Sequence, residues 1–116
     1  MSFYLGGKEI KPAFKLWFEI GGKHVLGEGT YALLSQIREK KSISAAAKAT
    51  NMSYRYAWDL IREVEEHLGE SVIKTQKGGK HGGSSELTDV SLSLLTNYRK
   101  LKKAMSEVCK LNDGSS

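Results

Sequence analysis

The chain has 116 residues, of which 40% are hydrophobic and 27% are charged, and its formal net charge is +5. This length suits a single domain with one hydrophobic core, and this composition excludes wholesale disorder. No apolar run approaches the roughly 20 residues that a membrane helix needs, and the N-terminus lacks the features of a signal peptide, so we expect a cytoplasmic protein with no membrane partner.

Cysteine and histidine usage argues against a metal site and against an enzyme. The single cysteine, Cys109, excludes an internal disulfide and has no second cysteine with which to share a metal ion. His24, His67 and His81 lie far apart, and none has the spacing of metal ligands or belongs to a Ser, His and acid grouping. We therefore expect no catalytic residue, no metal and no other cofactor.

The N-terminal part of the chain predicts a β-hairpin over 13–27. In "AFKLWFEI" apolar residues alternate along the chain, which is the period of a half-buried strand. Gly21 and Gly22 supply a tight turn, and "KHVLG" can return as the second strand.

Two helices are expected next. The first runs for about three turns from Glu28 or Thr30 to Lys40, because apolar residues in "YALLSQIREK" recur at helical spacing. The second is short and rich in alanine. We expect Ser44 to be its N-cap and Asn51 to close it in the left-handed conformation.

A third helix follows almost at once, so that 42–69 have the organisation of a helix-turn-helix. Ser53 is expected to cap this helix and Gly69 to end it. Its core-facing residues follow the spacing of one helical face, and they are Ala57, Ile61, Val64 and Leu68.

Residues 71–88 predict two strands, "SVIKTQ" and "SELT", around the loop "KGGKHGGS". A phosphate-binding loop would need a lysine followed by serine or threonine after its last glycine, with a helix behind, so this pattern excludes a nucleotide site. A flexible linker would explain the glycines but not Lys77, Lys80 and His81. A hairpin tip that carries cations along phosphates or into a minor groove explains both, and the segment is interpreted as the wing of a winged helix.

A final helix is expected over 88–111, capped by Thr88 or Asp89, with a frayed tail over 112–116. An apolar stripe on so long an element can exceed what a small domain covers, which predicts a homodimer. The residues expected at the dimer contact are Leu92, Leu95, Tyr98, Leu101, Met105 and Val108.

Cations are concentrated on the helix-turn-helix, because the chain from Ser35 to Arg62 is strongly basic and an acidic cluster follows directly. The second helix of such a motif presents its first turns to base edges in the major groove. Arg55 is the candidate for a guanine and Arg62 for a phosphate, and a solvated helix face is the alternative for both. Tyr54 and Trp58 can pack within the fold as readily as they can contact DNA.

Phosphate contacts are expected at the start of the second helix. Ser42 and Ser44 lie there beside free backbone amides, although an N-cap role alone would also explain Ser44. Lys48 faces outward, and solubility is its alternative role. The predicted DNA-binding residues are Ser42, Ser44, Lys48, Ser53, Tyr54, Arg55, Trp58, Asp59, Arg62, Lys77, Gly78, Gly79, Lys80 and His81.

Three segments together resemble a known family: "KSISAAA" over 41–47, "MSYRYAWDLIREVE" over 52–65 and "GGKHGGSSELT" over 78–88. They are similar to the DNA-binding domain of ModE-type molybdate-responsive transcription regulators, whose winged helix is similar to that of LysR-type regulators. The resemblance covers residues 14–108. It implies a sequence-specific regulator that binds double-stranded DNA and dimerises through its long terminal helix.

The resemblance also assigns residues. Its recognition region matches Ser44, Ser53, Tyr54, Arg55 and Trp58, and its wing matches Lys77, Gly78, Gly79 and Lys80. The family continues "LT" with a glycine, whereas this chain continues with "DVS". Family members that sense an oxyanion carry small β-barrel domains after the long helix, so for a chain ending at Ser116 we expect no molybdate sensing and no small-molecule ligand.

The expected fold class is therefore α+β and mostly helical: one winged helix-turn-helix domain over 1–116, with an N-terminal β-hairpin and a long C-terminal dimerisation helix. The expected function is transcription regulation through double-stranded DNA. An architectural DNA-binding protein with little sequence preference is the alternative, and a protein-interaction module that uses the same fold without DNA is a third hypothesis.

Overall fold

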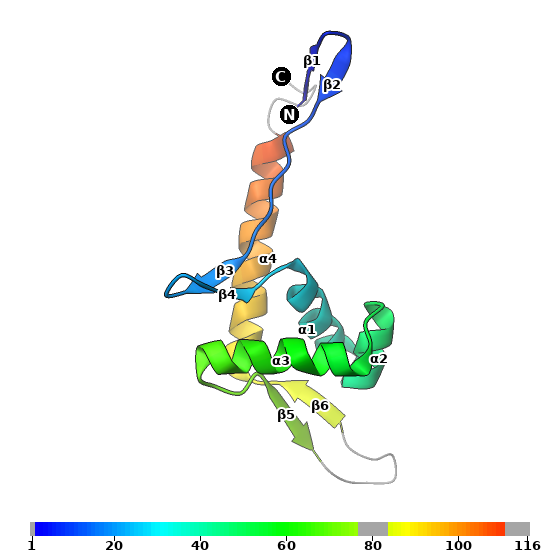
Figure 1. Cartoon of the computed structure of the whole chain (residues 1–116), viewed down its shortest axis with the longest axis vertical. Coiled ribbons are helices and arrows are strands. Elements are labelled where there is room, and N and C mark those ends of the chain that lie inside the picture. Colours follow the sequence, from blue (N-terminus) through cyan, green and yellow to red (C-terminus); the bar gives the residue numbers. More distant parts are fainter. Residues whose placement is uncertain (1, 77–83, 111–116) are drawn as a thin grey trace.

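The computed structural model describes residues 2–76 and 84–110. The elements in chain order are β1 (Phe3–Leu5), β2 (Lys8–Ile10), β3 (Phe18–Ile20), β4 (Lys23–Leu26), α1 (Glu28–Lys40), α2 (Ile43–Ala49), α3 (Tyr54–Leu68), β5 (Ile73–Gln76), β6 (Ser84–Leu87) and α4 (Asp89–Lys110). In Figure 1, α1, α2 and α3 gather at one end with the β5–β6 hairpin, and α4 rises away from them. The predicted α+β, mostly helical winged-helix class is confirmed.

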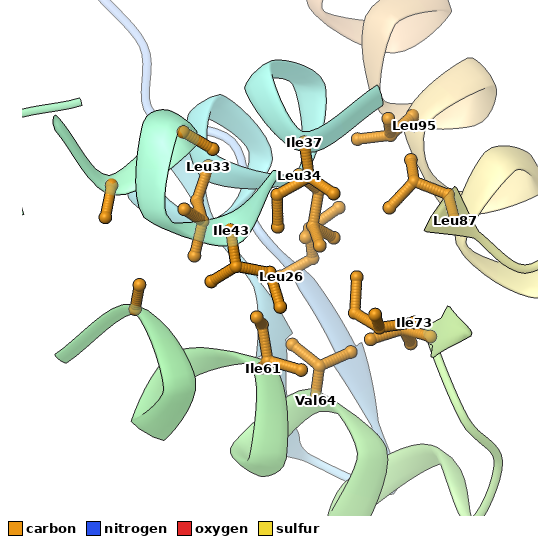
Figure 2. Close-up of a cluster of buried hydrophobic side chains, with 14 of the residues drawn as sticks. Leu26, Leu33, Leu34, Ile37, Ile43, Ile61, Val64, Ile73, Leu87 and Leu95 are labelled. Atoms are coloured by element: carbon orange, nitrogen blue, oxygen red, sulfur yellow. The ribbon is translucent and has the colours of Figure 1, made fainter. Parts of the chain in front are cut away.

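A hydrophobic core holds the helices, the β3–β4 pair and the β5–β6 pair together, whereas β1 and β2 contribute no residue to it. Figure 2 shows its side chains converging from β4, α1, α2, α3, β5, β6 and α4. Small residues separate the paired helices of the motif, because Ala46 and Ala47 of α2 and Ala57 of α3 are all buried. Their size lets the backbones of α2 and α3 approach each other, and the larger residues fill the space toward α1. Those larger residues are Leu26, Leu33, Leu34, Ile37, Ile43, Ile61, Val64 and Val72.

The predicted hairpin over 13–27 is paired along only part of its length. Strand β3 begins at Phe18, which lies opposite Leu26, and residues 11–17 form no strand. The partner strand is short because α1 begins at Glu28, immediately after its N-cap residue Gly27. Before β3, the backbone pairs with α4 instead, because the carbonyl oxygen of Leu16 accepts a hydrogen bond from the Tyr98 hydroxyl.

A second hairpin, β1–β2, precedes it and was not predicted. Its turn, Gly6-Gly7, has φ values of 58° and 77°, close to the 54° and 81° of Gly21-Gly22. Both turns need the left-handed region at two successive positions, which glycine reaches without strain. The segments "FYLGGKEI" and "FEIGGKHV" share the same pattern of a Gly-Gly turn between short strands, so the β1–β2 hairpin could have been predicted from the sequence.

Helix α4 is buried only along its first half. Ser91, Leu95 and Tyr98 are buried, and every later residue up to Lys110 is exposed or half-buried. Leu95 and Tyr98 are therefore corrected from dimer contact to core, since 2% and 0% of their surfaces are exposed. Both residues pack on the chain's own elements. The apolar spacing along α4 does not distinguish residues that the core covers from residues that a second copy would cover. The other four stay exposed: Leu92 (37%), Leu101 (49%), Met105 (39%) and Val108 (53%).

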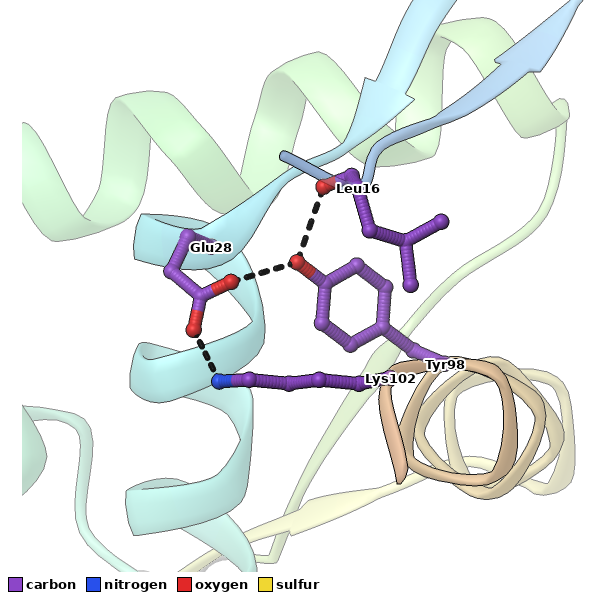
Figure 3. Close-up of polar contacts among 4 residues, drawn as sticks. All are labelled: Leu16, Glu28, Tyr98 and Lys102. Atoms are coloured by element: carbon purple, nitrogen blue, oxygen red, sulfur yellow. Dashed lines mark hydrogen bonds and ion pairs between the residues drawn. The ribbon is translucent and has the colours of Figure 1, made fainter. Parts of the chain in front are cut away.

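A polar contact joins α4 to the start of α1 (Figure 3). The Tyr98 hydroxyl lies 2.7 Å from Glu28 Oε2 and 2.9 Å from the carbonyl oxygen of Leu16, so one phenol proton faces two acceptors. The ammonium of Lys102 donates to the other carboxylate oxygen of Glu28. The hydrogen bond from Lys102, and after it the one from Tyr98, lowers the pKa of Glu28. Burial, and after it the hydrogen bond to Glu28, raises the pKa of Tyr98.

This carboxylate makes stability depend on pH. Because the pKa of Glu28 is lower in the folded state, its ionised form stabilises the fold above the usual glutamate pKa of 4.5. This contribution is lost as the pH falls through the folded-state pKa. We predict that Glu28→Gln lowers the free energy of unfolding at neutral pH by about 0.2 to 1 kcal/mol, the range for exposed ion pairs. Urea denaturation at several pH values measures this difference.

The difference between wild type and Glu28→Gln should close in acid. Glu107→Gln is the matched control, because Glu107 is exposed and makes no ion pair with the described residues. A wild-type advantage that persists unchanged at acidic pH would contradict a role for the charge.

Candidate nucleic-acid interface

The start of α2 is capped by Ser42, not by Ser44 as the sequence predicted. The Ser42 hydroxyl oxygen accepts a hydrogen bond of 3.0 Å from the backbone N–H of Ala45. The reason lies one residue earlier: Lys41 ends α1 in the left-handed conformation (φ 54°), which leaves Ser42 extended, as an N-cap must be. Ser44 lies inside the first turn of α2 and is exposed. The Ser44 hydroxyl therefore does not cap α2.

The turn between α2 and α3 follows the predicted order. Asn51 adopts the left-handed conformation, with φ of 59°, and the N–H of Met52 donates to the carbonyl of Ala47. Ser53 then caps α3 by accepting from the N–H of Tyr56 at 3.0 Å, and Gly69 ends the helix with φ of 73°. These local bonds set α3 against α2 with only a few residues between them.

The outer face of α3 carries a row of aromatic and cationic side chains. Tyr54 and Trp58 meet edge to face with ring centroids 6.4 Å apart, and the guanidinium carbon of Arg62 lies 5.5 Å from the Trp58 ring centroid. The three residues are spaced four apart, so they share one face of the helix. Trp58 is half-buried and packs against the core.

Beside this row, Arg55 and Asp59 are exposed and make no ion pair or side-chain hydrogen bond with the described residues. Arg55 therefore presents all its donors to solvent. Arg62 differs, because its guanidinium rests over the Trp58 ring, which limits the positions it samples. The two arginines on this helix thus have different surroundings, which suits different roles.

Tyr56 is an exposed aromatic residue on α3 that the sequence reasoning passed over. It lines a hollow between α3, the β3–β4 hairpin and the start of α1, together with Leu60 and Thr30. Its place in the "SYRYAWD" motif, between Arg55 and the core residue Ala57, is the signal that could have marked it. Lys48 and Ser44, by contrast, lie where predicted, exposed on α2.

The base of the wing is fixed to three helices. The N–H of Val72 donates to the Glu65 carboxylate of α3 at 2.8 Å, and the carbonyl of Val72 accepts from the N–H of Thr88 and the hydroxyl of Ser91. On the other strand, the N–H of Ser85 donates 3.0 Å to the carbonyl of Lys41, at the end of α1. The wing strands therefore keep a fixed position beside the helix-turn-helix.

The strand pair itself runs antiparallel, with Ile73 opposite Leu87 and Gln76 opposite Ser84. The predicted contact residues at the tip fall between these strands and lie outside the described residues, as does the predicted tail over 112–116. The tip residues are Lys77, Gly78, Gly79, Lys80 and His81.

Over 2–76 and 84–110, no three His, Cys, Asp or Glu side chains come together in a way that would suit a metal ion. Among the same residues, no helix is both long enough and apolar enough to span a lipid bilayer.

Comparison with known proteins identifies relatives by sequence, although the chain matches no family model. It is 35% identical over 80 residues to the molybdenum transport protein ModE of Herbaspirillum seropedicae, covering 69% of this chain and 30% of that protein. It is 32% identical over 83 residues to the molybdenum-pterin-binding protein MopB of Rhodobacter capsulatus, covering 72% and 31%. It is 36% identical over 67 residues to the DNA-binding transcriptional dual regulator ModE of Escherichia coli, covering 58% and 26%. The chain thus spans less than a third of the length of these relatives.

Solved structures share the fold. ArgP from Mycobacterium tuberculosis superposes with a TM-score of 0.54 at 18% sequence identity, over 70% of this chain and 28% of that one. Full-length OxyR from Pseudomonas aeruginosa also gives a TM-score of 0.54, at 14% identity, over 76% and 28%. Both are LysR-type regulators, so the predicted resemblance to ModE-type and LysR-type winged helices is confirmed.

The corrected cap can be tested by paired substitutions. We predict that Ser42→Ala lowers the free energy of unfolding by about 1 kcal/mol, because the N–H of Ala45 loses its acceptor. Ser44→Ala is the matched control and should change stability by no more than about 0.5 kcal/mol, since alanine suits a helix interior. Urea denaturation of both variants measures the difference. Equal losses at the two positions would show that Ser42 is not the cap.

Proposed function

We propose that this chain, a homologue of ModE-type regulators with a LysR-like winged helix, binds double-stranded DNA and regulates transcription. One observation carries the proposal: the exposed face of α3 presents Arg55 and Asp59, which have no ion pair or side-chain hydrogen bond with the described residues, beside the Tyr54, Trp58 and Arg62 row. Unpaired donors and acceptors on the first turns of a recognition helix are what base-edge readout requires. The name of the relative in Escherichia coli, a DNA-binding transcriptional dual regulator, supports the same function.

In this mechanism α3 enters the major groove with its N-terminal half. Arg55 donates two hydrogen bonds to a guanine, and Asp59 accepts from the amino group of a cytosine. Trp58 packs on the core behind them and sets how far the helix can enter. Arg62, held over the Trp58 ring, contacts a phosphate.

Phosphate contacts on both sides of α3 orient it in the groove. On α2, the hydroxyl groups of Ser42 and Ser44 and the ammonium of Lys48 face one strand. Across the motif, the proposed wing contacts use Lys77, Lys80 and His81, with Gly78 and Gly79 allowing close approach. The fixed wing base supports this arrangement, because Ser85 and Val72 are bonded to the ends of α1 and α3.

Two copies of the chain are proposed to pair through α4. Leu94, Leu101 and Val108 are seven residues apart, and Asn97 and Ala104 fall between them at the intermediate positions of a heptad. This seam lies on a different face from the buried Ser91, Leu95 and Tyr98, and all but the half-buried Leu94 is exposed. A two-fold pair would bury it against an identical seam. Of the previously expected residues, Met105 flanks this seam, whereas Leu92 lies on another side of α4, in a hollow with Arg38 and Leu87.

Selection of duplexes from a random pool tests the DNA proposal. We predict an enriched site for wild type, a flattened preference at one base pair for Arg55→Ala, and uniformly weaker binding to all sequences for Lys80→Ala. The flattening corresponds to about 1 to 3 kcal/mol of lost discrimination. Arg99→Ala on α4 is the matched control, because Arg99 is exposed on a helix that carries none of the proposed DNA contacts.

Outcomes of the selection separate the hypotheses. Affinity without an enriched site would favour an architectural protein, and no salt-sensitive duplex binding at all would favour a protein-interaction module. The same selection with molybdate or tungstate added tests the finer proposal that this chain does not sense an oxyanion, which predicts an unchanged site and affinity.

The α4 seam is tested by mass in solution. We predict a dimer for wild type and a dissociation constant raised by about tenfold or more in Leu101→Gln/Val108→Gln, because apolar surface is lost from both copies. Lys100→Gln/Glu107→Gln changes two exposed neighbours outside the seam and should leave the dimer intact. Analytical ultracentrifugation over a concentration series measures both. A wild-type monomer at high micromolar concentration would contradict the pairing.

A further inference from the structure

Helix α4 changes surroundings at Tyr98, which is its last buried residue. Before this point the helix packs in the core through Ser91 and Leu95. After it, the helix continues to Lys110 with the extended segment of residues 12–14 beside its end, as Figure 1 shows for the chain leading into β3. Tyr98 therefore lies where α4 leaves the winged-helix body.

Polar contacts hold this point from two directions (Figure 3). Glu28, in the first turn of α1, receives the Tyr98 hydroxyl at 2.7 Å on one oxygen and the Lys102 ammonium on the other. Because Tyr98 and Lys102 are one turn apart on α4, the single carboxylate of Glu28 binds side chains from two successive turns of that helix. The carbonyl of Leu16, 2.9 Å from the same hydroxyl, approaches from the N-terminal segment.

Aromatic rings surround these bonds. The Tyr31 ring of α1 stacks on the Tyr98 ring with centroids 4.5 Å apart, and the Phe18 ring of β3 meets it edge-on at 5.4 Å. The ammonium of Lys102 also lies 5.9 Å from the Tyr31 ring centroid. Elements from three places in the chain thus meet at one residue, so a swing of α4 would break several contacts together.

We propose that the contact between Glu28, Tyr98 and Lys102 is a joint that fixes the angle at which α4 leaves the winged-helix body. It thereby fixes the spacing of the two DNA half-sites that a dimer accepts. The spacing part rests on the proposed function, whereas the angle is a property of the single chain. Tyr98 and Lys102 act here as positioning residues, since neither belongs to the proposed DNA contact.

Geometry makes half-site spacing sensitive to this joint. The part of α4 after Tyr98 is about 18 Å long at 1.5 Å per residue. A change of about 10° at the joint therefore moves the far end of the helix by about 3 Å, which is close to the 3.4 Å rise of one base pair. If two copies pair through that end, the two recognition helices shift by a comparable distance, and half-site spacing follows the dimer geometry.

An intramolecular distance tests the joint without DNA. Spin labels at Glu66→Cys on α3 and Glu107→Cys on α4, in a Cys109→Ser background, report the angle by pulsed electron resonance. Labelled chains are diluted with unlabelled protein so that only distances within one chain contribute. We predict a narrow distribution for wild type and Lys103→Gln, the exposed neighbour used as control, and a clearly broader or shifted one for Tyr98→Phe and Lys102→Gln.

Folding does not obscure this result. Tyr98→Phe keeps the ring stack, and Lys102 has a side chain that is 40% exposed, so Lys102→Gln tests the joint even if the other variant loses stability. Circular dichroism checks that each variant is folded. Distributions identical to those of the control in the folded variants would overturn the joint.

Half-site spacing is measured with palindromic duplexes that differ by inserted base pairs. Wild type and Lys103→Gln should prefer one spacing, and Lys102→Gln should lose about tenfold of that preference while its affinity for a single half-site stays unchanged. A broader distance distribution together with an unchanged preference for half-site spacing would overturn the claim about spacing, while the claim about the joint would stand. No duplex binding by wild type would contradict the proposed function instead, and the distance measurement would still decide the joint.

Discussion

The arrangement of this molecule depends on the backbone at Val72, where hydrogen bonds join α3, the wing and α4. Its N–H donates to the Glu65 carboxylate of α3, and its carbonyl accepts from the N–H of Thr88 at 3.1 Å and from the Ser91 hydroxyl at 2.5 Å. The side chain of Val72 is fully buried, and so is Ser91. Buried backbone groups must be paired, so no one of the three elements can move without leaving a donor or acceptor unsatisfied.

This constraint explains how a chain with short strands presents a precise surface. The wing is bonded at its base to α3 and to the end of α1, and the caps at Ser42 and Ser53 fix the two helices of the motif. Arg55 and Asp59, which make no ion pair or side-chain hydrogen bond with the described residues, are then not needed to hold α3 in place. Helix α4 supplies Ser91 to the core and continues outward past Tyr98. It therefore links the part of the molecule proposed to bind DNA to the part proposed to pair.

Much of the fold could be predicted because local signals and tertiary contacts agree. The helix-turn-helix follows from the cap at Ser53, the left-handed Asn51 and the apolar stripe of α3, all of which act within a few residues. The alternative roles of Trp58 were resolved toward packing only by its neighbours in space. Arg55 makes no ion pair or side-chain hydrogen bond with the described residues, so its DNA-binding role stays a prediction from its position.

The rest could not be predicted because it depends on distant parts of the chain. Ser42, not Ser44, became the cap because α1 ends one residue before it, and helix boundaries are not fixed by composition. Tyr98 resembles its exposed neighbours on α4 in the sequence pattern, but it is buried by the rings of Phe18 and Tyr31 and the carboxylate of Glu28, which lie far away in the sequence. No local pattern indicates such contacts.

The most direct measurement of the central claim is a map of backbone amide shifts by NMR as a cognate duplex is titrated into the protein. The account predicts that the largest changes cluster over 42–48 at the start of α2 and over 53–62 on α3, with small changes on α4 beyond Tyr98. Changes confined to α4 and the β1–β2 hairpin, with α3 unaffected, would contradict it.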